Sequence, residues 1–70
     1  MKTKIVNCLS SGIRKSIDNP NTDQTVLKNV EVGETVEIDT NVTGYDWKDN
    51  KFYKCISPVE GWINQGVVEV

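Results

Sequence analysis

Histidine is absent from this chain of 70 residues, and cysteine occurs only twice, as Cys8 and Cys55. Without an imidazole, neither a cysteine nor a serine has the general base on which nucleophilic catalysis usually depends. Two cysteines this far apart also exclude a zinc site and a CxxC redox pair. Each lies among apolar residues, which favours reduced thiols packed as small hydrophobic groups over a disulfide. We therefore predict that the chain is not an enzyme and uses no cofactor or metal ion.

Long apolar runs are also missing. No segment approaches the ~18 apolar residues that a membrane-spanning helix requires, so we expect no membrane association. The N-terminus carries lysines, as a signal peptide does, but the apolar run after them is short and interrupted by Asn7. The expected location is therefore the cytoplasm, with association with a virus particle as the alternative.

The chain has no excess of basic residues. Its net charge is -2 at pH 7, whereas nucleic-acid-binding domains are normally basic. We therefore expect no nucleic-acid partner. The composition is that of one small soluble domain, spanning residues 1–70, near the lower size limit for a single apolar core.

The apolar residues that are present recur mainly with a period of two. Val36 and Ile38 alternate with polar neighbours, which is typical of a half-buried strand. In residues 51–57 the alternation places Tyr53 and Cys55 on one face and Phe52 on the other. Residues 4–9 and 66–70 are short and rich in β-branched side chains, so they are predicted to be strands as well. No window keeps a helical spacing for three turns.

Turn-forming residues separate these segments. Residues 18–23 carry Asn, Asp and Pro and predict a loop, and Gly33 predicts a tight bend. Asp49 and Asn50 are predicted to form a two-residue hairpin turn, because both tolerate the positive φ that such turns need. Residues 57–61, which include Pro58, predict another turn.

Several segments, in this order, resemble bacterial Src-homology-3-like domains. SSGIRKS (residues 10–16) is similar to their Leu-Asn-Val-Arg segment, and TVLKNVEVGETVEI (25–38) to their central strands. KFYKCIS (51–57) resembles their aromatic-x-Lys-Val strand, and GWINQGVVEV (61–70) their Gly-Trp-Val ending. The resemblance implies an all-β, five- or six-stranded barrel, with a single helical turn at residues 64–66 before a last strand that pairs beside the first. Lys15, Ser16 and Ile17 replace the family's Gly-Pro turn, which predicts an altered loop and ligand groove.

The candidate binding residues are aromatic side chains and one arginine. Tyr45, Trp47 and Phe52 gather around the predicted hairpin, where exposed rings would contact a partner. The alternative is that Trp47 and Phe52 only pack against each other across the hairpin. Trp62 is a further candidate, although a half-buried structural role is favoured. Arg14 either contacts a ligand or forms a surface ion pair.

These observations predict a non-enzymatic interaction module. Its expected role is that of a protein-binding or assembly component, for instance in a phage or mobile-element assembly, with a protein partner or a second copy of the chain. The alternative, which the family resemblance implies, is binding of cell-wall peptidoglycan or peptide.

Overall fold

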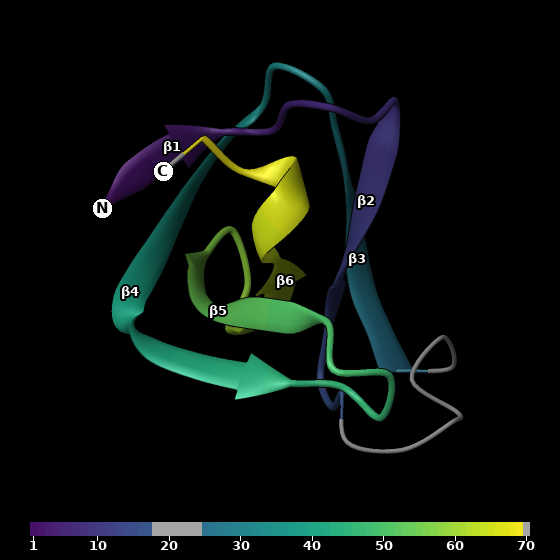
Figure 1. Ribbon diagram of the computed structural model, residues 1–70. Coiled ribbons are helices and arrows are strands. Elements are labelled where there is room, and N and C mark those ends of the chain that lie inside the picture. The colour runs from purple at the N-terminus through teal and green to yellow at the C-terminus, as the bar shows by residue number, and fades with distance from the viewer. Residues whose placement is uncertain (18–24, 70) are drawn as a thin grey trace.

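The computed structural model describes residues 1–17 and 25–69. Within these residues the chain is all-β, with six antiparallel strands in one sheet and a single 3-10 turn (Figure 1). The elements are β1 (Lys2–Lys4), β2 (Ser10–Arg14), β3 (Val26–Glu31), β4 (Thr35–Tyr45), β5 (Lys51–Ser57), β6 (Gly61–Asn64) and the 3-10 turn η2 (Gln65–Val67). The predicted loop at residues 18–23 lies outside the described residues.

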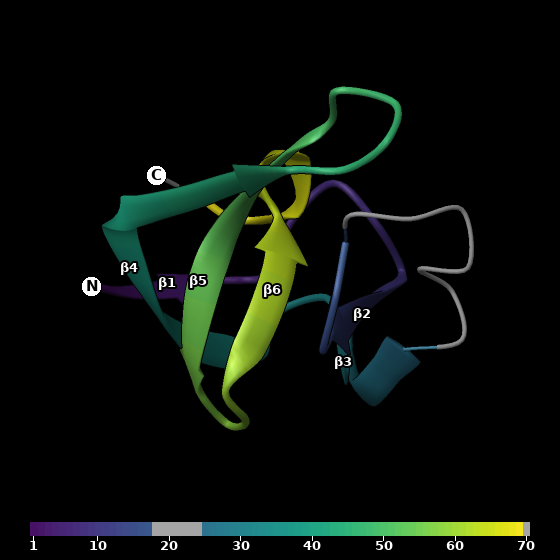
Figure 2. The same ribbon diagram turned by 90° about the horizontal axis from the view of Figure 1, so that it is seen from below.

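The sheet curls into a small barrel-like fold, with strand order β1-β4-β5-β6-β2-β3. Strand β4 bends so that its first half pairs with β1 and its second half lies across β5 (Figures 1 and 2). The segment after β1 closes the structure, because the Ile5 N–H donates to the Glu34 carbonyl at 3.0 Å and Ile5 forms an isolated bridge with Val68. The two terminal segments therefore lie side by side.

The core fills the inside of this curled sheet. Its buried members come from β2 to β6 and from the two closing segments: Ile5, Ile13, Val30, Val36, Ile38, Cys55, Ile63 and Val68. The alternation predicted for Val36 and Ile38 is confirmed. Both cysteines are free thiols, with Cys55 fully buried and Cys8 half-buried against the same core.

A second buried set lies on the opposite face of β5 and β6. On β5, Phe52 and Lys54 are two positions apart and so lie on the same face of the strand. Phe52 is opposite Gly44 of β4, and Lys54 is opposite Trp62 of β6. Directly opposed residues of antiparallel strands share a face, so these side chains point away from the main core. Ile17 is also buried and lies against Gly44.

The predicted terminal strands are only partly correct. Residues 4–9 do not form one strand: β1 ends at Lys4, and Asn7 adopts a left-handed conformation with φ of 59°. The last segment pairs beside the first as expected, but through the bridge at Val68 rather than a full strand. The single helical turn is present, with Asn64 capping it through a bond from the Gly66 N–H at 2.7 Å.

The hairpin prediction also needs correction. Strand β4 ends at Tyr45 and β5 begins at Lys51, so the connection has five residues rather than two. Asp49 does have positive φ, at 64°, as predicted. The turn is longer because the carboxylate of Asp46 binds the backbone of the loop, which stabilises a wider geometry than a two-residue turn allows. Among the described residues, no helix has the length and apolar character needed to cross a membrane.

Candidate interaction site

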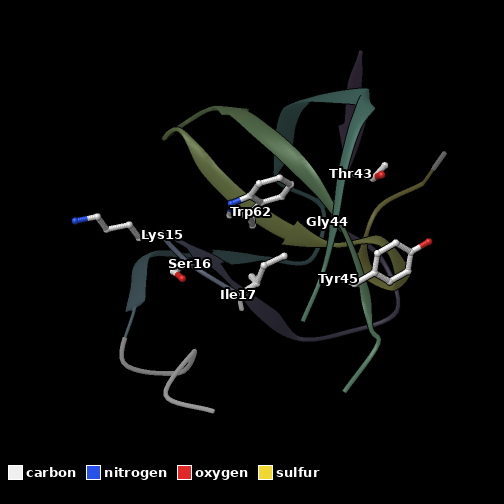
Figure 3. A pocket seen from close by; sticks show the side chains of 7 residues that line it. All are labelled: Lys15, Ser16, Ile17, Thr43, Gly44, Tyr45 and Trp62. Carbon is white, nitrogen blue, oxygen red and sulfur yellow. The ribbon is translucent and has the colours of Figure 1, made fainter. Parts of the chain in front are cut away.

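A groove lies where the segment after β2 meets the end of β4 and the middle of β6. Its volume is about 330 Å³, and its lining residues are Lys15, Ser16, Ile17, Thr43, Gly44, Tyr45 and Trp62. Figure 3 shows Ile17 and the Trp62 indole on one side of β4, with the Tyr45 ring on the other. The Lys15 side chain extends outward from the edge of the groove.

Backbone hydrogen bonds hold the first wall of the groove in place. The Lys15 N–H donates to the Thr25 carbonyl at 2.8 Å, and the Thr25 hydroxyl donates to the Ser16 carbonyl at 2.8 Å. These bonds continue the β2–β3 pairing past Arg14. They bring Ile17 against β4, where it is buried, so this wall is preformed rather than assembled on binding.

Gly44 forms the base of the groove. A Cβ at this position would lie 3.1 Å from Cδ1 of Ile17 and 3.3 Å from Cζ3 of Trp62. Those separations are shorter than ordinary carbon–carbon contact distances. The absence of a side chain at residue 44 therefore leaves room for β4 to pass directly over the indole and the isoleucine.

Two cationic side chains flank Trp62 on the neighbouring strands. Arg14 of β2 is its cross-strand partner on one side, and Lys54 of β5 is its partner on the other. The Lys54 ammonium lies 5.3 Å from the centre of the indole, within the range of a cation–π interaction. Lys54 also forms an ion pair with Glu60 at 3.6 Å. We call Arg14, Trp62 and Lys54 the cationic ladder.

The hairpin aromatics divide into exposed and buried residues. Tyr45 and Trp47 are 57% and 53% exposed, and the Lys48 ammonium lies 4.8 Å from the Trp47 ring centre. Phe52 is only 4% exposed. Phe52, which the sequence predicts among the partner-binding residues, is thus buried on the face of β5 and β6 that also carries Trp62 and points away from the main core.

Asp46 stabilises the loop that presents Trp47. Its Oδ1 accepts hydrogen bonds from the N–H groups of Lys48 and Asn50, both at 2.8 Å, and its Oδ2 accepts from the Asn50 side chain at 3.0 Å. Desolvation raises the pKa of Asp46, but the hydrogen bonds from Asn50 and Lys48 and the Lys48 charge together hold it below its usual value. The exposed indole is thus carried on an ordered loop.

Among the described residues, no group of thiols and carboxylates converges on a metal-binding cluster. Burial raises the pKa of the Cys55 thiol, and a weaker backbone hydrogen-bond interaction with Ser57 acts in the opposite direction. A buried thiol with a raised pKa is a poor nucleophile. In residues 1–17 and 25–69, no three metal-binding side chains of the His, Cys, Asp or Glu type come together.

Tyr45 and Trp62 both line the groove, but their rings lie on opposite sides of β4. Arg14 is the cross-strand neighbour of Trp62, and Trp47 is on the adjoining loop. The family resemblance predicts an altered loop at Lys15, Ser16 and Ile17, but no sequence pattern assigns Ile17 or Gly44 to a binding site. A glycine within an otherwise alternating strand signals a close approach of another segment, and Gly44 is such a case.

No family model, no curated protein and no solved structure matches this chain.

Proposed function

We propose that this protein is a non-enzymatic interaction module that binds a segment of a partner protein. The observation that carries the proposal is the preformed groove beside Trp62, next to two aromatic side chains that are each more than half exposed. Exposed tyrosine and tryptophan side chains dominate the energetics of protein interfaces. Binding costs little conformational entropy in the loop that carries Trp47, because the hydrogen bonds to Asp46 already hold this loop in place.

A protein of this kind suits a component of a larger assembly, such as a phage particle. We also infer that it is a divergent Src-homology-3-like domain. The strand count, the antiparallel pairing and the 3-10 turn directly after Gly61-Trp62-Ile63-Asn64 support that inference.

The test of partner binding is site-specific photo-cross-linking in the cells that make the protein. A benzophenone amino acid replaces Trp47 in one variant and Leu27, an exposed residue of β3 outside the site, in the control. We expect one defined adduct, with another protein or a second copy, at position 47 only. Adducts of equal yield at both positions, or none at position 47, would contradict the proposal.

Binding of a cell-wall peptide or glycan is the second candidate. The position of the groove supports it, because the groove is lined by Lys15, Ser16 and Ile17, where the family resemblance predicts an altered ligand groove. The test is co-sedimentation with isolated bacterial sacculi, using the native chain, Trp47→Ser and the control Leu27→Ser. Saturable binding that Trp47→Ser alone abolishes would favour this function, and no sedimentation of the native chain would exclude it.

A further inference from the structure

We propose that the partner segment binds as an additional β-strand along the free edge of the second half of β4, at Thr43 and Tyr45. This inference rests on the proposed function and specifies how the segment is recognised, which is through its backbone. The second half of β4 pairs with β5 only, because the pairing with β1 is confined to residues 35–38 of β4. Figure 1 shows this half of β4 at the rim of the fold, with β5 on its inner side.

The register with β5 determines which backbone groups reach this edge. The Asp46 N–H donates to the Asn50 carbonyl at 3.0 Å, so these two residues form a hydrogen-bonded pair. Such pairs alternate along an antiparallel ladder, and Gly44 is therefore the next residue of β4 that is bonded to β5. The N–H and C=O groups of Thr43 and Tyr45 consequently point away from β5, and the described residues supply no hydrogen-bond partner for them.

These outward groups are spaced to pair with an extended peptide backbone. Thr43 and Tyr45 are both exposed, so the edge is open to a ligand. A Cβ on residue 44 would point at Ile17 and Trp62, and directly opposed residues of paired strands share a face. A side chain of the added strand opposite Gly44 therefore lies on the face that Ile17 and Trp62 occupy. The occupant is thus an extended segment with one apolar residue opposite Gly44, and it requires no particular charge.

The edge of β3, at the end of the sheet, is protected against such pairing. The Glu31 N–H donates to the Glu34 carboxylate, and the Glu31 carbonyl accepts from the Glu34 N–H at 3.0 Å. A register shift between Ile13 and Arg14 also makes the pairing of β2 with β3 irregular. Bulges and charged side chains are the usual protection of exposed edges. Residues 43–45 have neither, since their register with β5 is regular and none of them is charged.

A second copy of the chain fits this edge less well than a flexible segment does. The register of β4 with β5 shifts between Asp39 and Thr43, where β4 bends (Figure 1). Two β4 strands could therefore pair only over residues 43–45 before each chain turns away. A flexible segment can follow the edge and continue past Tyr45 toward the loop that carries Trp47.

Amide hydrogen exchange of the free full chain, measured by NMR, tests whether the edge is open. We expect the N–H groups of Thr43 and Tyr45 to exchange about 100-fold faster than that of Gly44, which lies between them but is bonded to β5. Equal protection of the three amides would overturn the inference.

Proline at the edge tests strand pairing itself. Thr43→Pro removes the outward N–H without breaking a bond to β5, and proline is tolerated at such positions. We expect it to lower the yield of the cross-link at position 47 at least about fivefold, as loss of a backbone hydrogen bond and a steric block predict. Thr43→Ala, which keeps the N–H, and Asn29→Pro, which makes the same change at the edge of β3, should leave the yield unchanged. Circular dichroism of each variant verifies that it is folded.

The possible failures of this test are distinguishable. A cross-link that persists in folded Thr43→Pro would overturn strand addition and leave the proposed function standing. A cross-link to a second copy would overturn the choice of occupant. Absence of any cross-link in the chain that carries only the benzophenone substitution would contradict the proposed function, and the inference with it.

Discussion

Gly61 passes so close to Arg14 that a Cβ on residue 61 would lie 2.7 Å from the Arg14 carbonyl oxygen. The same Cβ would lie 2.9 Å from Cγ2 of the buried Ile13. This contact joins β6 to β2 directly beside the pair of Arg14 and Trp62, so it fixes the position of the cationic ladder. The glycine at residue 61 is therefore required by packing between strands.

Gly61→Ala is expected to destabilise the fold by ~1–3 kcal/mol, because the added methyl group meets a backbone atom that cannot rotate away. Urea denaturation, followed by tryptophan fluorescence, measures this loss. The matched control is Gly66→Ala, where the nearest atom is Oδ1 of the Asn64 side chain at 3.2 Å, which can move. Equal losses in the two variants would contradict the close-approach explanation.

Phe52 and Trp47 are expected to differ sharply in their contribution to stability. Phe52→Ala should cost ~3–5 kcal/mol, because it removes a buried aromatic side chain. Trp47→Ser should change the free energy of unfolding by less than about 0.5 kcal/mol, as is usual for an exposed position. Chemical denaturation of both variants measures the two values.

This comparison also decides the role of Trp47. A loss of several kcal/mol in Trp47→Ser would show that its indole stabilises the hairpin by cross-strand packing. Its proposed contact with a partner would then lose its main support. Tyr45→Ser, at the other exposed ring of the hairpin, serves as the control for general effects of surface substitution.

The two thiols are expected to react at different rates in the folded protein. Iodoacetamide at pH 8 should modify the half-buried Cys8 and leave the buried Cys55 untouched until urea unfolds the chain. Peptide mass spectrometry over a time course distinguishes the two sites. Modification of both at the same rate in the absence of urea would show that Cys55 is not protected by the core.

Burial of Cys55 also predicts a loss of stability at alkaline pH. Because the folded state raises the pKa of this thiol, its stabilising contribution is fully present below the unfolded thiol pKa of about 8.5 and is lost as pH rises toward the folded value. The free energy of unfolding should therefore fall more steeply above pH 8.5 in the native chain than in Cys55→Val. Parallel pH profiles for the two proteins would contradict this.

Strong local patterns in the sequence predict much of the fold. The alternating residues 51–57 coincide with β5, and the bend at Gly33 has the positive φ, 89°, that only glycine adopts freely. The 3-10 turn after Trp62 was expected from the resemblance and is present. In each case the determining interaction lies within a few residues of the chain.

The sequence is less informative where distant segments decide the structure. Residues 4–9 contain β-branched side chains that are typical of a strand. The backbone of Ile5, however, pairs with Glu34 and Val68, and the chain turns at Asn7 instead of continuing as a strand. The groove depends likewise on the sheet order, which places residues after β2 beside β4 and β6. The residues next to Ile17 and Gly44 in the sequence therefore do not indicate that these two residues line the groove.

Asp46 is expected to make the stability of the β4–β5 loop depend on acid pH. The hydrogen bonds from Lys48 and Asn50 outweigh desolvation and lower its pKa in the folded state. Its stabilising contribution is therefore present above the unfolded carboxyl pKa of about 3.9 and is lost as pH falls through the lower folded value. Asp46→Ala should be less stable than the native chain at pH 6, and the difference should shrink toward pH 2.

Urea denaturation at several pH values, combined with an NMR titration of the Asp46 carboxyl carbon, tests this directly. Asp46→Asn is the matched control, because its side-chain oxygen can still accept from the Lys48 and Asn50 N–H groups but does not ionise. If the difference in stability between the native chain and Asp46→Ala stays constant with pH, the effect of the substitution does not depend on the ionisation of Asp46. If the loop also holds residue 47 in place for binding, Asp46→Ala should lower the cross-linking yield of the benzophenone side chain at position 47, since the loop would then have to be ordered during binding.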